Sequence, residues 1–243
     1  ESERRLPSGL GEIEYRDAAG VMNWVNNHSD LKFCDVCLFP FCASGNAFLK
    51  ANSLYPEKFV NVRLWVTTNL FQIRKTIVEN PTPFNPEHKG FLSETDLDAG
   101  FRYVFEEFKE QGHIIDTSNV EFTVDRMSAK RYAHNVKVPV LFCDPKNDTA
   151  FNHINDAPGI FEGFPNKNSE FHWIGTDQLG AFKTKTDNRA EGYNFYYSDN
   201  GKEVLFDFIN KHCPRKKLRK KYPIASMHSA YKRLRHSYLI KGL

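Results

Sequence analysis

Cys42 stands in a stretch whose residue types can support nucleophilic chemistry. It follows a short apolar run and precedes the small residues Ala43 and Ser44. This order predicts a buried strand that feeds a sharp strand-to-helix turn. Such a turn lifts a nucleophile above the edge of a sheet, with small residues two before and two after it. Pro40 and Ser44 hold those places, where glycines are common, and a buried inert cysteine is the alternative interpretation.

The elements that must position this turn alternate between strands and helices. Apolar patterns predict strands at 35–39, 59–67, 136–143 and 171–175, and helices at 11–25, 46–52 and 203–212. The alternation indicates the α/β class, with a mostly parallel sheet and helices on both faces. The proline-rich stretch 80–86 cannot continue a helix or a central strand, so it predicts the entry to a partly helical insert.

Composition and cysteine usage narrow the class of protein. A chain of 243 residues can bury one substantial core, and no apolar run approaches the roughly 18 residues of a membrane span. The number of cysteines, five, is odd, which favours an intracellular, reducing compartment (cytoplasm or organelle) over a disulfide framework. Cys34 and Cys37 have the spacing of a redox or metal pair, but residues three apart in a strand point to opposite faces, and no second Cys or His pair is placed to complete a zinc site. We therefore expect neither metal nor redox function of this pair, and no cofactor.

The basic residues gather at the end of the chain. Residues 211–243 contain eleven Lys or Arg residues and no Asp or Glu, although the net charge of the whole chain is only +3. The remainder is therefore acidic. We expect residues 213–243 to form a basic C-terminal tail that can contact nucleic acid, an anionic surface or an acidic partner. The alternative is a solvated tail that folds back onto the acidic body of the same chain.

Several phrases, in order along the chain, resemble the dienelactone-hydrolase-like group of the α/β-hydrolase superfamily. They are Tyr15-Arg16-Asp17, Leu38-Phe39-Pro40-Phe41-Cys42, Asp125-Arg126-Met127-Ser128, Trp173-Ile174-Gly175-Thr176 and Gly192-Tyr193-Asn194. The resemblance covers roughly residues 10 to 212 and implies one hydrolase-like domain over 1–212, with a helical lid at about 80–132. Only about 34 residues precede the strand that leads into the turn at Cys42 (the elbow), fewer than this fold usually carries there. We therefore expect either further sequence upstream or another chain that covers this edge of the sheet.

The resemblance also implies a set of site residues. Cys42 would be the nucleophile, and the N–H of Ala43 would donate to the oxyanion. Asp148, in the loop after the strand 136–143, would be the acid of the triad, with Asp144 as its rival. This fold normally takes its histidine from the loop after the last strand, but residues 176–183 contain none. His153 is then the candidate base, whereas His172 and His134 are expected on the wrong strand or at the wrong sheet edge.

Two functions from different classes follow. The first is hydrolysis of a small ester, thioester or lactone through a cysteine nucleophile, with the small acyl compound as the only partner needed. The second is a catalytically inactive hydrolase-like subunit or scaffold in a larger, organellar or RNA-containing assembly, where a protein partner covers the bare sheet edge. The missing histidine and the basic tail favour the second function, and the cysteine turn favours the first.

The basic tail gives a prediction that salt can test. If residues 213–243 bind RNA or anionic lipid, binding should weaken steeply as salt rises, because each neutralised phosphate releases counterions. Affinity for a mixed-sequence RNA and for anionic vesicles, measured between low and physiological salt, checks this. A tail bound to its own acidic body would instead give no detectable binding at any salt.

Overall fold

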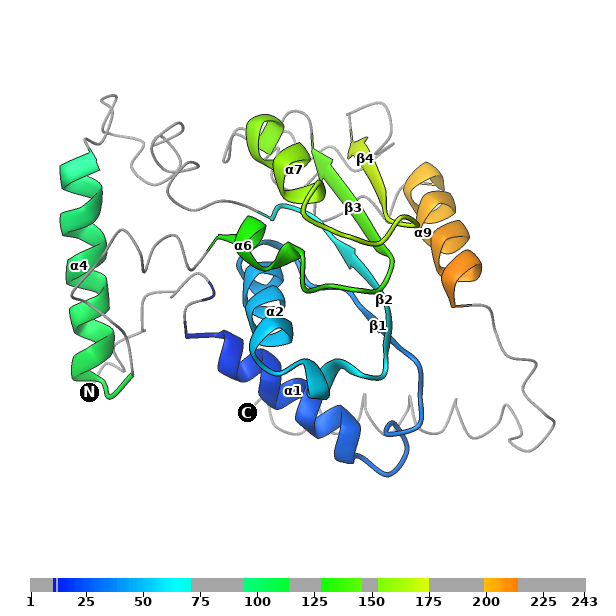
Figure 1. The fold of residues 1–243 in the computed structure, drawn as a ribbon, viewed down its shortest axis with the longest axis horizontal. Coiled ribbons are helices and arrows are strands. Elements are labelled where there is room, and N and C mark those ends of the chain that lie inside the picture. The colour runs from blue at the N-terminus through cyan, green and yellow to red at the C-terminus, as the bar shows by residue number, and fades with distance from the viewer. Residues whose placement is uncertain are drawn as a thin grey trace, which may run out of the picture. The chain divides into compact units, whose positions relative to one another are not determined.

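The computed structural model describes residues 11, 13–70, 94–113, 128–145, 153–174 and 199–213, all within one compact unit, Glu1–Cys213. Figure 1 shows its elements in order. They are α1 (Tyr15–Asn27), β1 (Val36–Leu38), α2 (Cys42–Leu54), the 3-10 turn η1 (Pro56–Phe59), β2 (Val62–Thr67), α4 (Glu94–Glu110), α6 (Ala129–Ala133), β3 (Val140–Pro145), α7 (His153–Phe161), β4 (Glu170–Ile174) and α9 (Asp199–His212). The tail after Cys213 and most of the expected insert lie outside the described residues.

The four strands form one parallel sheet in the order β1-β2-β3-β4. Leu38 pairs with Trp65, Trp65 with Val140, and Cys143 with His172. Helices α2 and α7 lie in the connections after β1 and β3, as parallel neighbours require. The predicted α/β class is confirmed. A functional consequence follows: all four strands end at the same edge of the sheet.

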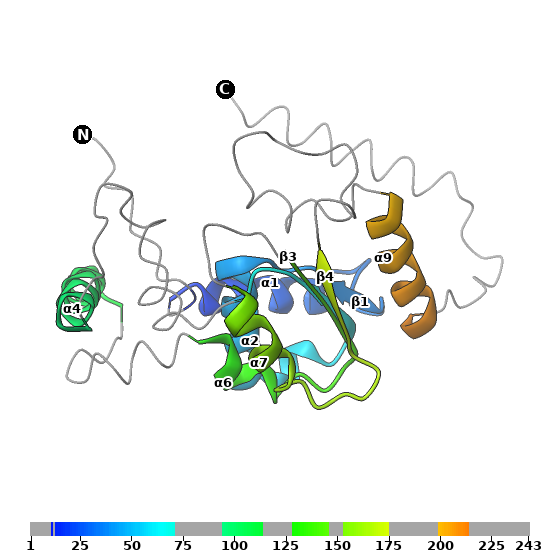
Figure 2. The same cartoon turned by 90° about the horizontal axis from the view of Figure 1, so that it is seen from above.

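The sheet is covered on both faces, because alternate residues of each central strand point to opposite sides. Trp65 and Phe142 pack into the larger core with α1, α2, α6 and α7. Leu64, Leu141 and neighbouring apolar side chains pack against α9. Figure 2 shows α9 on the side of the sheet away from α2, α6 and α7. The expected helices on both faces are therefore present.

Several boundaries differ from the sequence-based expectation for local reasons. The second strand begins at Val62 instead of residue 59, because Pro56–Phe59 form a 3-10 turn with proline at its start. The third begins at Val140 instead of residue 136. Pro139 precedes it and, having no N–H to donate, only accepts a hydrogen bond, from Trp65 N at 3.0 Å. The helix expected at 46–52 begins earlier, at Cys42.

Strand β1 is a short edge strand with apolar side chains beside it. It has three residues, and among the described residues it pairs with β2 alone. Phe33 is 88% exposed and Phe39 is 38% exposed.

In the part of the chain that the structure describes, no helix is long and apolar enough to cross a membrane.

The larger core yields a stability prediction. Phe142 is fully buried and its ring meets that of Phe171 edge-on at 5.5 Å. We expect Phe142→Ala to lower the free energy of unfolding by about 3–5 kcal/mol, because it removes the ring and leaves a cavity. Phe206→Ala is the matched control, since Phe206 is 57% exposed and should cost at most about 0.5 kcal/mol. Denaturant unfolding measures both, and equal losses would contradict the described core.

Candidate active site

The turn between β1 and α2 places Cys42 in a backbone conformation that non-glycine residues rarely adopt. Cys42 has φ +50°, whereas Phe41 before it is extended at φ −121°. Helix α2 begins at Cys42 itself, so the backbone changes directly from the extended Phe41 to the helix. A left-handed residue at this junction lets the chain reverse sharply and leaves the side chain at the sheet edge. Cys42 is half-buried.

Hydrogen bonds to the end of β2 hold this turn in place. The Cys42 N–H donates to the Thr68 carbonyl at 3.0 Å, and Phe41 pairs with Thr68 in a parallel bridge. The Thr67 hydroxyl donates to the Pro40 carbonyl at 2.8 Å. The turn is therefore fixed by a neighbouring strand whose last residues are buried.

The first turn of α2 supports the elbow from the other side. The Ser44 hydroxyl donates to the Phe41 carbonyl at 2.6 Å and accepts from the Phe41 N–H at 3.0 Å. At Gly45, an added Cβ would run into Cδ2 of the buried Leu70 and lie 3.3 Å from Thr67 Oγ1. A glycine here lets α2 approach the end of β2 closely. The small-residue pattern around Cys42 thus has two separate causes, a local hydrogen bond and a close packing contact.

The start of α2 creates an environment that favours negative charge. The first N–H groups of a helix lack helical partners, and the helix dipole places partial positive charge there. Cys42 is the first residue of a 13-residue helix, followed by Ala43. A helix N-terminus of this kind stabilises a thiolate.

Asp144 lies at the same end of the sheet, next to the end of β2. It is fully buried in β3, and its Oδ1 accepts a hydrogen bond from the Asn69 N–H at 2.8 Å. Asn69 itself has φ +54°, and its side-chain oxygen accepts from the Thr68 hydroxyl at 2.7 Å. Asp144 therefore has a structural role. It holds Asn69 at the end of β2, and the preceding residue Thr68 holds Cys42. Burial, followed by the nearby Asp144, raises the pKa of the Cys143 thiol.

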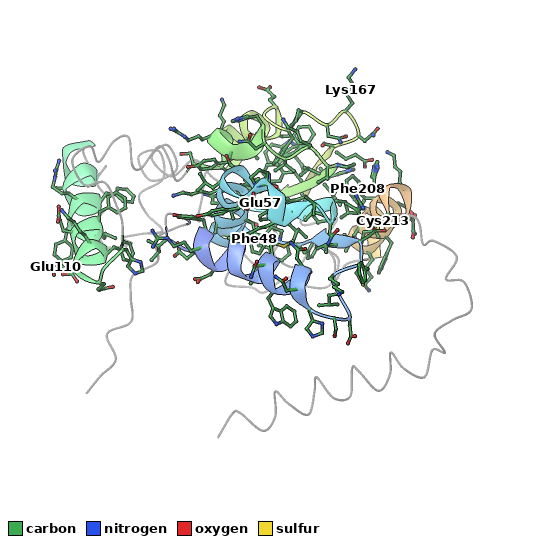
Figure 3. All side chains as sticks on the ribbon, turned by 60° about the horizontal axis from the view of Figure 1, so that its bottom comes forward. Phe48, Glu57, Glu110, Lys167, Phe208 and Cys213 are labelled. Carbon is green, nitrogen blue, oxygen red and sulfur yellow. The ribbon has the colours of Figure 1, made fainter. Side chains whose placement is uncertain are left out.

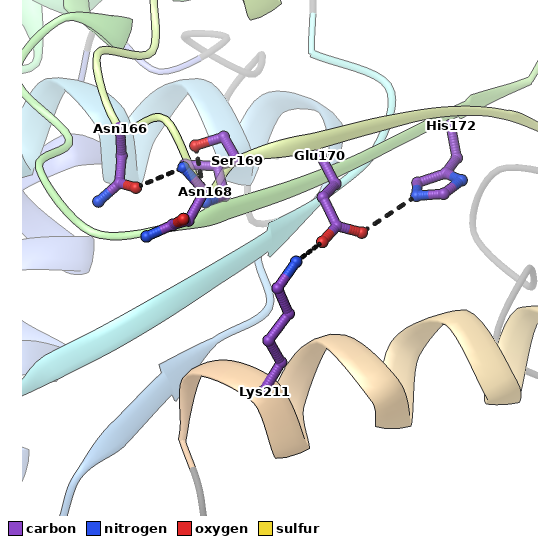
Figure 4. A network of polar contacts seen from close by, with 7 residues as sticks. Asn166, Asn168, Ser169, Glu170, His172 and Lys211 are labelled. Carbon is purple, nitrogen blue, oxygen red and sulfur yellow. Dashed lines mark hydrogen bonds and ion pairs between the residues drawn. The ribbon is translucent and has the colours of Figure 1, made fainter.

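The His172 side chain interacts with Glu170 on the face of the sheet that α9 covers, away from Cys42. Its Nε2 lies 3.5 Å from Glu170 Oε2, and Lys211 Nζ from α9 donates to Glu170 Oε1 at 2.6 Å, as Figure 4 shows. The hydrogen bond from Lys211 is the main cause that lowers the pKa of the Glu170 carboxyl. β4 is three strand spacings from β1, roughly 14 Å. His172 therefore does not reach Cys42 from this strand.

The remaining sequence-predicted residues are described only in part. Asp148 lies outside the described residues, and so does the side chain of His153, although its backbone begins α7. His134 follows α6 and precedes β3, at the end of the sheet where the strands begin. The structure thus brings Cys42, the Ala43 backbone and Asp144 to one edge and keeps His134 at the other.

Two hollows lined by described residues lie away from the elbow. One, of about 160 Å³, is lined by Trp65 and by residues that include Asn135 and Lys137. The other, of about 500 Å³, is bordered by Lys50, Arg131 and Asn135 among others. Neither is lined by a residue of the turn 40–45. Both lie near the residues that precede β3, and so at the end of the sheet where the strands begin.

Sequence reasoning missed the contribution of Thr67, Thr68 and Asn69. The alternating pattern predicts Thr67 only as the end of a strand and gives no role to the two residues after it. The signal that was available is the polar run Thr67-Thr68-Asn69 directly after the apolar run Leu64-Trp65-Val66. Polar residues at the carboxyl end of a buried strand commonly serve a site at that edge.

Comparisons with known proteins assign no family to this chain. No family model and no curated protein matches the chain. A peroxisomal α/β-hydrolase from Saccharomyces cerevisiae is 9% identical over 98% of this chain and 70% of its own, with TM-score 0.49. An α/β-hydrolase enzyme from the metagenome of lagoon sediments at Mar Chica, Morocco, is 13% identical over 84% and 76%, with TM-score 0.44. At these identities and TM-scores the likenesses carry no argument about the site.

The left-handed backbone at Cys42 predicts that glycine is more stabilising than alanine at this position, the reverse of their usual order in a helix. A left-handed conformation costs a non-glycine residue roughly 1–2 kcal/mol, whereas glycine adopts it freely. We therefore expect Cys42→Gly to be about 1 kcal/mol more stable than Cys42→Ala, although glycine at an ordinary position of α2 should be the less stable of the two. Denaturant unfolding of both variants measures this, with Ala51→Gly, in the buried interior of α2, as the control. A Cys42→Gly protein less stable than Cys42→Ala would contradict the turn.

Proposed function

We propose that this protein is an α/β-hydrolase-like enzyme that cleaves a small ester, thioester or lactone, with Cys42 as its nucleophile. The observation that carries the proposal is the left-handed backbone of Cys42, the first residue of α2, three residues after the end of β1 at Leu38. Strain at a single non-glycine residue persists only where the surroundings fix it, and it gathers at functional sites. Here the surroundings are the bonds to Thr67 and Thr68 at the end of β2.

The chemistry follows from the position of the thiol. The Cys42 thiolate attacks the acyl carbon, the carbonyl oxygen becomes an oxyanion, and the Ala43 N–H donates to it. Loss of the alcohol or thiol leaving group, with a proton, leaves an acyl-cysteine. Water then attacks that thioester, releases the acid and returns the thiol.

A base and an acid complete the proposal. We assign His153 as the base and Asp148 as the residue that orients it. Support for this assignment is topological: both follow β3, and α7 begins at His153 after that strand has ended. All parallel strands end at one edge, which is also the edge of Cys42. Asp144 is the less suitable acid, because its Oδ1 already accepts from the Asn69 N–H.

A second candidate function is that of a non-catalytic subunit with a hydrolase-like fold. The observation that favours it is the edge of β1, where Phe33 and Phe39 are exposed beside an outer side with no described strand. Exposed apolar side chains along an unpaired edge are typical of a surface that another chain covers. The position of His172, bonded to Glu170 and far from β1, agrees with this alternative.

Iodoacetamide alkylation and acyl-ester turnover decide between the two. An activated Cys42 should be alkylated at pH 7 at least about ten times faster than Cys34, an exposed cysteine that serves as the internal control. With p-nitrophenyl acetate, the protein should give a burst of one nitrophenolate per chain, and intact mass should show one acetyl group. Cys42→Ser should abolish the burst, whereas Cys34→Ser should leave it unchanged.

Two results would count against the enzyme. Equal alkylation rates of Cys42 and Cys34 would remove the activated thiolate. Alkylation of Cys42 without any burst or turnover, on several acyl esters and thioesters, would leave a reactive thiol without hydrolysis and favour the non-catalytic subunit. His153→Gln separates the base from the nucleophile: it should slow turnover while the position of acylation remains Cys42.

A further inference from the structure

Two cysteines with no part in the proposed chemistry meet on the α9 face of the sheet. Cys37 lies in the middle of β1 and is exposed, and Cys213 directly follows α9 and is half-buried. The Cys213 thiol lies near enough to the Cys37 thiol to help raise its pKa. Both are free thiols. The two thiols therefore lie near one another, one on strand β1 and the other directly after helix α9.

The architecture explains why residues so far apart in the sequence meet. Cys37 pairs with Leu64 of β2, and paired residues of adjacent strands project to the same face. Leu64 belongs to the apolar cluster under α9, and Cys213 packs against that cluster. Figure 3 shows Phe208 and Cys213 on the same helix end, next to the sheet. The Cys213 N–H also donates to the Ile209 carbonyl at 2.7 Å, which keeps residue 213 on the helix.

We propose that Cys37 and Cys213 form a reversible disulfide that fastens the C-terminal end of α9 to the edge strand β1. Neighbouring thiols that form a disulfide must approach to the S–S bond length of about 2.05 Å. Because Cys37 is an exposed residue, a small oxidant has access to the pair. The bond would tie the first described strand to the last described helix and so close most of the domain into a loop.

A small disulfide such as oxidised glutathione can supply the oxidation. One cysteine thiolate attacks a sulfur of the small disulfide, forms a mixed disulfide and expels one small thiolate. The second cysteine thiolate then attacks the protein sulfur of the mixed disulfide, forms the Cys37–Cys213 bond and expels the second small thiolate. The protein loses two electrons and two protons, and the small disulfide is reduced to two thiols.

The environment of Cys37 sets the conditions for the reaction. Partial burial of the thiol, then the neighbouring Cys213 and Asp35, raises the pKa of the Cys37 thiol to about 11. Little thiolate is present there near neutral pH, so oxidation should be slow and the pair should remain a dithiol in a reducing medium. Equilibration for hours at a pH of about 8.5, near the pKa of an ordinary thiol, is therefore the appropriate condition.

The test uses the full chain in buffers of graded oxidised and reduced glutathione, quenched with acid. Trypsin yields a peptide of residues 33–50, which holds Cys34, Cys37 and Cys42, and a peptide of residues 212–215, which holds Cys213. The two should become crosslinked as the buffer turns oxidising and separate as it turns reducing. Further cleavage after Asp35 and after Leu38 separates the three cysteines of the first peptide, so the wild-type chain itself identifies the partner.

Variants sharpen the assignment. Cys37→Ser and Cys213→Ser should each abolish the crosslink, whereas Cys34→Ser, a neighbouring exposed cysteine whose thiol donates to the Asp30 carbonyl instead, should retain it. The crosslinked chain should also unfold at a higher temperature than the reduced chain. The proposal is overturned if Cys213 pairs with Cys34 or Cys42, if the crosslink joins two chains, or if oxidising buffer leaves Cys37 and Cys213 free to alkylate. Because Cys42 is not involved, this outcome does not depend on whether the protein is a hydrolase.

Discussion

The pairing of the elbow with the end of β2 is the constraint on which the rest of the site depends. Phe41 is bridged to Thr68, and the Cys42 N–H donates to the Thr68 carbonyl. With these two residues fixed beside β2, the chain enters α2 through the left-handed Cys42. The end of β2 is itself held by Asp144 of β3 through the Asn69 N–H. Three successive strands thus determine the position of one thiol.

Packing on the larger face offsets the cost of that turn. A left-handed non-glycine residue costs roughly 1–2 kcal/mol. On the same helix, Phe48 meets Trp65 of β2 edge-on at 6.5 Å, and Trp65 stacks on Phe59 at 6.4 Å. Aromatic pairs of this kind contribute about 0.5–1.5 kcal/mol each beyond their burial. The helix that begins with strain is therefore anchored by aromatic contacts further along its length, and Gly45 between them allows the close approach to Leu70.

The sequence was sufficient for the four strands and for helices α1, α2 and α9, because buried parallel strands leave long apolar runs and helices leave a 3.6-residue period. It indicated no helix between the third and fourth strands, where α7 lies, and it extended the second strand into the 3-10 turn η1. It located the turn at Cys42 correctly, since an apolar run that stops at a cluster of small residues is typical of a strand entering a tight turn. It could not reveal that Asp144 is fully buried under Asn69, because a carboxylate at a strand end looks the same whether it is catalytic or structural. Nor could it reveal that Cys37 meets Cys213, because that contact joins opposite ends of the domain and depends on the register of β1 against β2.

Side chains alternate between the two faces of the sheet along β1. This alternation keeps Cys37 and Cys42, to which we assign different chemistry, in different surroundings. Cys37 projects toward α9, whereas Leu38 packs into the opposite core and the chain then runs past the sheet edge to Cys42. A thiol on the face of a strand and a thiol beyond its end have different neighbours, so Cys37 lies near Cys213 and Cys42 lies at a helix N-terminus. Oxidation at the first therefore need not consume the second. It would instead fix the strand that leads into the elbow, because the same short β1 carries both.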